Sequence, residues 1–172
     1  MILTVVDYNP NWPNAFEQEA IHLRALLGEL LVEIHHIGST AVPNLKAKPI
    51  IDMMPEVTSL AALDDKSEVM IQLGYEVMGE MGIPGRRYFR KGGEHRTHQV
   101  HAFVAGDPNI QRHLAFRDYL RTHKEIAAEY GALKSQIAQN THNNIEKYWQ
   151  AKAPFIQFHE SKALAWYDQQ NN

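Results

Sequence analysis

Cysteine is absent from this sequence of 172 residues, and so is any long apolar run. The first absence excludes disulfides, thiolate zinc sites and a cysteine nucleophile, and it is consistent with a reducing compartment. The second matters because a membrane helix needs roughly 18 consecutive apolar residues. The start of the chain also lacks the basic charge and the apolar length of a signal peptide. We therefore expect a cytoplasmic protein with no membrane partner.

An excess of positive charge is missing as well. The 17 lysines and arginines are outnumbered by 20 acidic residues, which gives a net charge of −3. Bulk electrostatics therefore do not favour a nucleic-acid partner. The hydrophobic fraction of 44% is ordinary for a globular protein, and the length suits one domain. We expect a single domain over residues 1–172, with a sheet part at 1–105 and a helical part at 106–172.

Apolar residues recur with the spacing of strands and helices through the first part of the chain. The patterns predict strands over 1–6, 31–37, 49–54, 75–78, 87–91 and 97–104, and helices over 12–30 and 60–73. After Gly106 the pattern is helical, beginning at Asp107-Pro108, with a capping box at Thr122-x-x-Glu125 and a break at Asn143-Asn144. This order indicates an α/β (α+β) fold whose C-terminal helices pack on the sheet.

The loop Gly38-Ser39-Thr40 follows one predicted strand, and Asp52 lies in the next apolar run. Glycine permits a close backbone approach, and the amides and hydroxyls of such a loop can bind phosphate oxygens. An acid delivered by the neighbouring strand can hold a divalent cation that faces the phosphate. The alternative is an ordinary turn at the end of a strand, where glycine and serine are common.

Asp52 is the more telling of these residues because it interrupts an apolar strand. On a regular strand it shares one face with Ile50 and Met54, while Ile51 lies on the other face. A carboxylate in such a run is costly unless it is paired, hydrogen-bonded or bound to a metal. The alternative to a functional acid is a buried salt bridge to Lys48 or to an arginine.

Two histidines lie in the strand predicted at 97–104. His98 and His101 are three residues apart, so a regular strand points them to opposite faces, and a zinc site would need a bulge. Val100 shares the face of His98 and is typical of core, which leaves the face with Gln99 and His101 available to a ligand. The alternative for His101 is a structural role in the sheet.

Basic residues cluster on the strand predicted at 87–91, on the neighbouring histidine strand and around the turn that joins them, at Arg86, Arg87, Arg90, Lys91 and Arg96. Arginine suits bidentate phosphate contacts, and two cations aimed at the Gly-Ser loop would form a clamp. A solvated, charged hairpin is the alternative. Arg117, on a later predicted helix, is either part of a polar helix face or reaches the same loop.

Taken together, several of these blocks resemble the GrpB family. They are His-Ile-Gly-Ser-Thr-x-Val-Pro at 36–43, Lys-Pro-Ile-Ile-Asp at 48–52, Arg-Thr-His-x-x-His at 96–101 and Phe-Arg-Asp-Tyr-Leu-Arg at 116–121. The resemblance implies membership of the nucleotidyltransferase superfamily related to DNA polymerase beta. It also implies a minimal nucleotidyltransferase fold, with a mixed sheet flanked by helices. Some bacteria fuse such a domain to dephospho-CoA kinase, which suggests a link to coenzyme A through that fusion alone.

In that superfamily, carboxylates hold two magnesium ions that position a nucleotide and activate a hydroxyl. The resemblance assigns Gly38-Ser39 to the phosphate loop and Asp52 to the first acid. The second acid should stand at position 54, where this chain has Met54. His101 or His98 stands where the third acid is expected, and histidine suits zinc or manganese better than magnesium.

The resemblance therefore implies nucleotidyl transfer from a nucleoside triphosphate to a small-molecule acceptor, with Mg²⁺ or Mn²⁺ held by Asp52. For this reaction, the residues predicted to bind phosphate are Gly38, Ser39, Thr40, Lys48, Arg87 and Arg90. Those predicted to assist the substrate or the metal are His98 and His101. The alternative is a catalytically silent module that binds a nucleotide or phosphorylated ligand, and Met54 favours it. A metal-dependent hydrolase that uses the histidines is disfavoured by the strand geometry.

Overall fold

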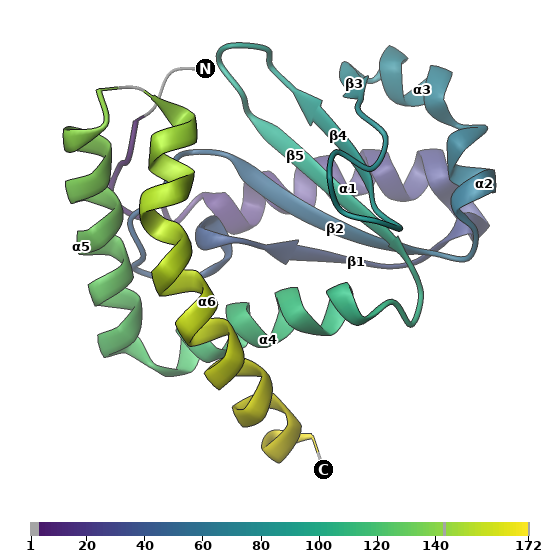
Figure 1. Cartoon of the computed structure of the whole chain (residues 1–172). Helices are drawn as coiled ribbons and strands as arrows, with labels where there is room; N and C mark the ends of the chain where they lie inside the picture. The colour runs from purple at the N-terminus through teal and green to yellow at the C-terminus, as the bar shows by residue number, and fades with distance from the viewer. Residues whose placement is uncertain (1–3, 143, 172) are drawn as a thin grey trace.

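The computed structural model describes residues 4–142 and 144–171, and its centre is a five-stranded mixed sheet (Figure 1). The strands are β1 (Leu31–Ile37), β2 (Ile51–Val57), β3 (Tyr75–Val77), β4 (Arg87–Lys91) and β5 (His98–Val104). Their order across the sheet is β1-β2-β5-β4-β3, and only the pair formed by β2 and β5 is parallel. The sequence prediction of an α+β fold with a mixed sheet is confirmed.

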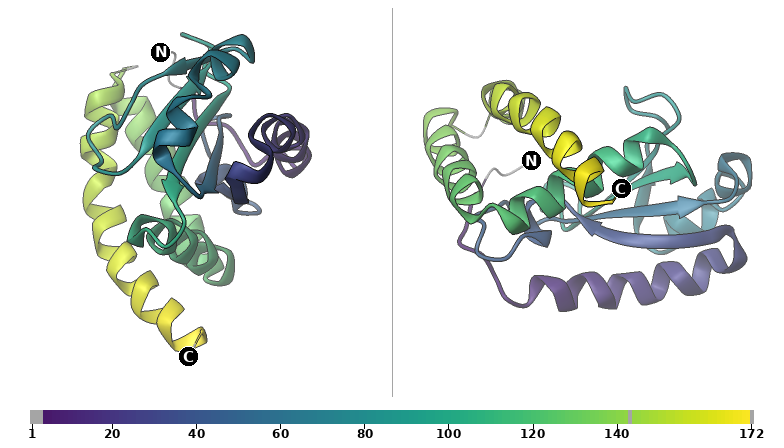
Figure 2. Two further views of the ribbon diagram at one scale, coloured as in Figure 1. Left: turned by 90° about the vertical axis from the view of Figure 1, so that its right-hand side faces the viewer. Right: turned by 90° about the horizontal axis from the view of Figure 1, so that it is seen from below.

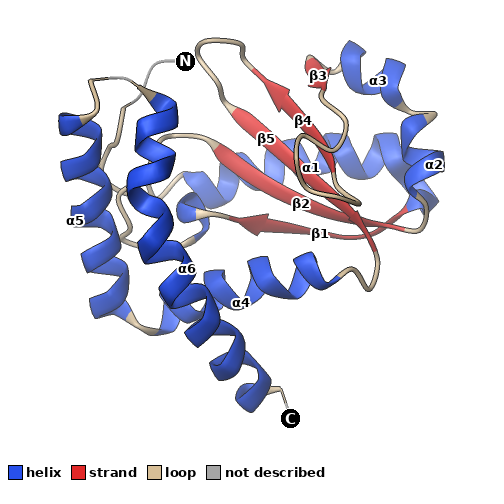
Figure 3. Cartoon of the chain, viewed as in Figure 1, coloured by secondary structure: helices blue, strands red, loops and turns tan. Residues whose placement is uncertain are grey.

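Helices cover both faces of this sheet (Figure 3). They are α1 (Trp12–Leu27), α2 (Leu60–Asp64), α3 (Ser67–Gln72), α4 (Pro108–Thr122), α5 (Lys124–Asn140) and α6 (Ile145–Gln170), and short 3-10 turns are η1 (Gly28–Leu30) and η2 (Ser39–Ala41). The view from below separates α1 on one face from α4 and α6 on the other (Figure 2). Within the described residues, no helix combines the length and apolar character that crossing a membrane requires.

The strand alternation predicted from the sequence sorts side chains between these two layers. Met53 and Val100 point toward α1 and belong to the main core, together with Phe16 and Leu23. Met54 points the other way and is fully buried. It packs in a second apolar cluster formed by Ile37, Met54, Phe103 and Ile110, which joins β1, β2 and β5 to α4. Position 54 is therefore a core position under α4.

Three local predictions need correction. The strand predicted at 1–6 is reduced in its described part to a single bridge between Val6 and Ala47, and residues 1–3 lie outside the described residues. The helix predicted at 60–73 is divided into α2 and α3, and a new turn begins at Lys66. The capping box at 122–125 does not form, because α4 continues through Thr122 and His123 caps α5 without a side-chain bond.

The other C-terminal predictions agree with the structure. Asp107 caps α4 by accepting a hydrogen bond from the backbone N–H of Asn109 at 2.8 Å. Helix α5 ends at Asn140, and Asn144 caps α6 by accepting from the N–H of Lys147 at 3.0 Å. Helices α4, α5 and α6 share an apolar cluster with the loop that follows η2. The buried faces of α5 and α6 are thereby brought over the β2 face that carries Asp52.

Candidate functional site

The loop after β1 is packed directly against Asp52. Gly38 has a φ of 74°, a backbone conformation that favours glycine. A Cβ built on Gly38 would lie 2.7 Å from Oδ2 of Asp52 and 3.2 Å from its Cβ. Because any larger residue would displace the carboxylate, glycine is required both for the turn and for the close approach.

The side chain of Thr40 holds this loop in place. Its hydroxyl lies 2.9 Å from Nε2 of His36 and donates to the carbonyl oxygen of Ile50 at 3.3 Å. Burial lowers the pKa of His36 to about 4, so the ring is neutral near pH 7 and donates from Nε2 to the hydroxyl. The Thr40 hydroxyl is thus committed to internal bonds, which differs from the phosphate contact predicted for it.

Two arginines of α4 fix the ends of the same loop. Nη1 of Arg117 donates to the carbonyl oxygen of His36 at 3.1 Å, and Nε of Arg121 donates to that of Ala41 at 2.9 Å. Charge-assisted bonds of this kind are among the stronger hydrogen bonds in proteins. Arg117 therefore reaches the loop, as one of the two sequence interpretations expected, and it acts there on the backbone.

His101 joins Asp52 to a buried arginine. Oδ1 of Asp52 lies 2.9 Å from Nε2 of His101, and Nη1 of Arg86 lies 3.3 Å from Nδ1. Since a guanidinium only donates, Nδ1 accepts and Nε2 carries the proton that is donated to Asp52. Arg86 also donates to the carbonyl oxygens of Glu80 and Met81. These bonds orient one carboxylate oxygen and tie it to the loop between β3 and β4.

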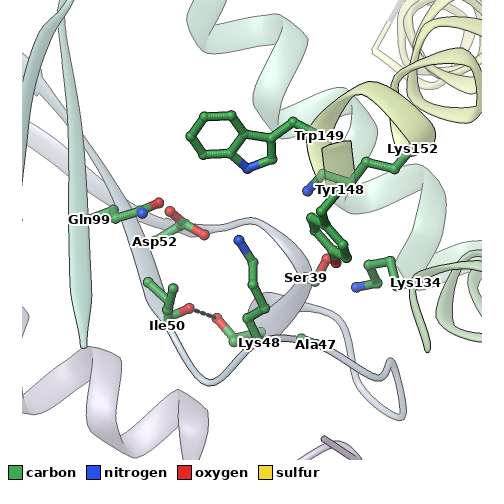
Figure 4. A pocket seen from close by; sticks show the side chains of 11 residues that line it. Ser39, Ala47, Lys48, Ile50, Asp52, Gln99, Lys134, Tyr148, Trp149 and Lys152 are labelled. Carbon is green, nitrogen blue, oxygen red and sulfur yellow. Dashed lines mark hydrogen bonds between the residues drawn. The ribbon is translucent and has the colours of Figure 1, made fainter. Parts of the chain in front are cut away.

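A cleft opens between Asp52 and the helices α5 and α6, with a cavity volume of about 130 Å³ (Figure 4). A second cavity, of about 280 Å³, adjoins it on the α4 side and shares Ser39, Asp52 and Lys152 with it. We call the two together the Asp52 cleft. Lys48, Lys134, Gln99 and the aromatic side chains of Tyr148 and Trp149 also line it.

Three lysines from three different segments meet in the Asp52 cleft. Nζ of Lys48 and Nζ of Lys152 lie 5.1 and 4.9 Å from the ring centre of Tyr148, and Nζ of Lys134 lies 4.4 Å from that of Tyr130. Within residues 4–142 and 144–171, none of the three ammonium groups has a carboxylate within 4 Å. The cleft therefore offers buried positive charge to an anion.

The proton affinity of these lysines reflects their burial. Burial lowers the pKa of Lys152 to about 8, and neighbouring Lys48 lowers it further while Asp52 opposes the shift. Burial also holds the pKa of Lys134 well below its usual value. Each charge thus costs stability in the folded chain, because the unfolded chain binds the proton more tightly.

This pKa shift predicts a dependence of stability on pH. Between about pH 8 and the unfolded lysine pKa of about 10.4, the unfolded chain binds more protons than the folded one, so stability rises with pH. We expect the thermal midpoint of the ligand-free protein to rise between about pH 7.5 and 9.5 relative to a Lys134→Met/Lys152→Met variant. Circular dichroism melts across that range measure the difference, and parallel profiles for the two proteins would contradict the assignment.

Two residues predicted to contact substrate lie on the opposite face of the sheet. Nε of Arg87 donates to Oδ1 of Asp64 at 2.8 Å, on the side covered by α1 and α2. His98 also faces α1, where its Nε2 lies 3.2 Å from Oε2 of Glu19. The prediction that His98 and His101 point to opposite faces of the sheet is therefore confirmed. Neither Arg87 nor His98 reaches the Asp52 cleft.

Arg90 shares the face of Asp52 but is two strands away. Its Nη2 donates to Oε2 of Glu76 at 3.3 Å, which keeps it at the β3 edge of the sheet. The sequence-predicted residues that the structure does bring together around the cleft are Gly38, Ser39, Thr40, Lys48, Asp52 and His101. A clamp from Arg87 and Arg90 is not formed.

Comparison with known proteins places this arrangement in a family. The sequence matches the family model described as GrpB protein over residues 2–162. The chain belongs to the GrpB family. Similar proteins include the UPF0157 protein YqkA of Bacillus subtilis, 47% identical over 98% of this GrpB-family chain and 49% of the relative. This chain spans about half the length of that relative.

Other relatives extend the comparison. The UPF0157 protein BH1888 of Halalkalibacterium halodurans is 33% identical over 90% of this chain and 79% of its own. A dephospho-CoA kinase of Mycobacterium leprae is 26% identical over 95% of this GrpB-family chain and 47% of the kinase. The crystal structure of the conserved protein GrpB from Enterococcus faecalis superposes with a TM-score of 0.92, at 46% identity, over 95% and 99% of the two chains.

A more distant match identifies the fold. The structure of Cid1 in complex with its short product ApU gives a TM-score of 0.52 at 14% identity, over 76% of this chain and 42% of Cid1. At this identity the likeness concerns the fold alone. The GrpB-family chain therefore has a nucleotidyltransferase-like fold, as the resemblance of its motifs implied.

The side chains of this GrpB-family chain do not fit a two-metal centre. Among the described residues, Asp52 is the one carboxylate that lines both cavities of the cleft, and one of its oxygens accepts from His101. Glu160 lines the second cavity alone, where it is paired with Arg112 at 3.4 Å. Met54 is buried where the second acid would stand, and Gln99 is the cross-strand neighbour of Asp52. Within the described residues, no group of three or more histidines and carboxylates is placed to hold a metal ion.

Sequence reasoning did not single out Lys134 and Lys152 as site residues. A signal for both is present, because each lies on the apolar stripe of its helix. Lys134 falls between Tyr130 and Ile137 on the buried side of α5. Lys152 follows Tyr148 by four residues on α6. A lysine within an apolar helix face indicates a buried charge, which either has a function or pairs with a group on another element.

Proposed function

We propose that this chain binds a nucleotide or another phosphorylated small molecule in the Asp52 cleft. The observation that carries the proposal is the meeting of Lys48, Lys134 and Lys152 beside the Gly38-Ser39 loop. Ammonium groups that are desolvated and without carboxylate partners gain most from a ligand with several negative oxygens. Phosphate groups meet that description, and the loop amides add donors.

The aromatic side chains of the cleft favour a nucleotide among such ligands. Trp149 is 51% exposed, although large aromatic side chains usually lose most of their exposure on folding. Its indole stands at the cleft beside Gln99 and Asp52 (Figure 4). A flat apolar surface next to a polyanion site suits a base that stacks while its phosphates meet the lysines.

Nucleotidyl transfer to a small-molecule acceptor is the second candidate, supported by the nucleotidyltransferase-like fold and by the position of Asp52 next to the loop. In such a step, an acceptor oxygen would form a bond to the α-phosphorus as the bond to pyrophosphate breaks. The free oxygen of Asp52 would take the acceptor proton, while His101 holds the other oxygen. The lysines would stabilise the charge that passes to pyrophosphate.

The binding proposal is tested by thermal shift with nucleoside triphosphates, tripolyphosphate and dephospho-CoA, the last because some relatives are dephospho-CoA kinases. We expect at least one triphosphate to raise the thermal midpoint by several degrees at millimolar concentration. The shift should fall sharply in Lys152→Met, because the variant removes one of three converging charges.

Lys162→Met is the matched control for this variant. Lys162 lies ten residues further along α6, is exposed, and places its Nζ over the ring of Phe158. The control should keep the full ligand shift. Equal losses in the two variants, or no shift with any of the compounds, would refute binding in the Asp52 cleft. Transfer is tested separately, by release of pyrophosphate from a triphosphate that binds.

A further inference from the structure

The charge around Asp52 is the reverse of what a metal-binding site needs. A centre for divalent cations gathers several carboxylates so that their oxygens offset the ion's charge. In the Asp52 cleft, three ammonium groups lie around Asp52. The other carboxylate of the described lining, Glu160, belongs to the second cavity and is paired with Arg112 at 3.4 Å. Burial reduces the screening between these charges, so a divalent cation would meet strong repulsion from the lysines. The same arrangement attracts an anion.

The geometry of the strands prevents a second carboxylate from joining Asp52. The position two residues on is Met54, which has no exposed surface and packs with Ile37 and Phe103 beneath α4. An acid at this place would be buried in an apolar cluster, where it could reach neither solvent nor a metal. Position 54, where the family resemblance places a second acid, is therefore part of the core that holds α4 to the sheet.

The lysines, in contrast, stand where a polyanion would be received. Lys48 precedes β2, Lys134 lies on α5 and Lys152 on α6, so the three approach the cleft from separate directions (Figure 4). Lys134 has no hydrogen-bond partner for its Nζ among the described residues, although that atom is fully buried. An ammonium group in this state requires a partner, and a phosphate oxygen is one that the cleft can admit.

We propose that the Asp52 cleft binds the phosphate groups of its ligand without a divalent metal, with the three lysine ammonium groups in direct contact with the phosphate oxygens. This inference rests on the proposed function. It also assigns a different task to Asp52, which supplies a counter-charge to the lysines while the cleft is empty. Once an anion is bound, the carboxylate is a neighbouring like charge and opposes it.

This assignment gives Asp52→Asn opposite outcomes under the two kinds of binding. If the lysines bind the anion directly, removing the carboxylate removes a repulsion, and affinity rises by roughly three- to tenfold. If a metal held by Asp52 bridges to the phosphates, the same variant loses the metal and the affinity falls. Asn is similar in size to Asp and can accept from His101 through its side-chain oxygen, so the packing of Gly38 is retained.

The experiment is titration calorimetry of ATP and of tripolyphosphate into the protein, each with EDTA or with Mg²⁺ or Mn²⁺ in excess. We expect binding in EDTA, weaker binding with Mg²⁺ because the ion neutralises phosphate charge, and tighter binding to Asp52→Asn. Asp65→Asn is the control, since Asp65 is exposed at the end of α2 and outside the cleft. The control should bind like the wild-type protein.

The possible results distinguish metal-free binding from the proposed function on which it rests. Binding that needs Mg²⁺ or Mn²⁺ and disappears in Asp52→Asn overturns the metal-free site, while the proposed function stands. Absence of binding by the wild-type protein to either anion under all conditions overturns both. The wild-type titrations alone distinguish metal-free from metal-dependent binding, so the test does not depend on the folding of any variant.

Discussion

Replacing Gly38 with alanine is expected to lower the stability of this protein by about 2–4 kcal/mol. Two costs add together. Alanine is strained at a φ of 74°, and its Cβ would meet Oδ2 of Asp52 at 2.7 Å. The carboxylate cannot move without disturbing its bond to His101, which is itself held by Arg86. For a chain of this length, the loss corresponds to a fall in thermal midpoint of roughly 4–16 °C.

Gly28→Ala separates the two costs. Gly28 also has a positive φ, of 54°, with a ψ of −127°, compared with −173° at Gly38. A Cβ on Gly28 would have nothing within 4 Å. It should therefore show the backbone strain without the collision, and lose clearly less stability than Gly38→Ala. Thermal and urea unfolding of both variants measure the difference. Equal losses would show that contact with Asp52 adds nothing at Gly38.

Replacing Lys134 with methionine is expected to change stability and binding in opposite directions. Lys134 is 2% exposed and its ammonium group lacks a hydrogen-bond partner among the described residues, so its charge is a cost in the ligand-free protein. Methionine keeps most of the apolar stem and its packing on Tyr130. We expect a gain of about 1–2 kcal/mol, which raises the midpoint by roughly 2–8 °C.

The same variant should bind triphosphate about tenfold more weakly or worse, because a buried charge that contacts phosphate is lost. Lys124→Met is the control, since Lys124 is exposed at the start of α5 and should change stability by no more than about 0.5 kcal/mol. Melts without ligand and calorimetry with ATP give the two quantities. A destabilised Lys134→Met with unchanged affinity would mean that Lys134 serves the fold and has no part in the site.

Much of the sheet could be predicted because strand alternation is a local property. The period of two residues placed Asp52 and Met54 on one face of β2, and it separated His98 from His101 on β5. Both assignments hold in the structure. The family resemblance added that the sheet is mixed and flanked by helices, which local patterns do not contain.

The site was less predictable because its residues come from helices that fold against the sheet. Periodicity marks the buried face of α5 or α6, but it does not reveal which part of the sheet that face will meet. Lys134 and Lys152 were therefore not predicted as site residues, and Arg87 was predicted as part of a clamp. Its pairing with Asp64 depends on the break between α2 and α3, which the helix predicted over 60–73 did not contain.

The walls of the Asp52 cleft come from opposite ends of the sequence. Asp52 and the Gly38-Ser39 loop belong to the sheet part, while Lys134 and Lys152 belong to the helical part. A chain without cysteine has no covalent connection between two such parts beyond the backbone itself. An anion bound by both walls would act as a removable cross-link. The ligand concentration would then determine how stably α5 and α6 pack on the sheet.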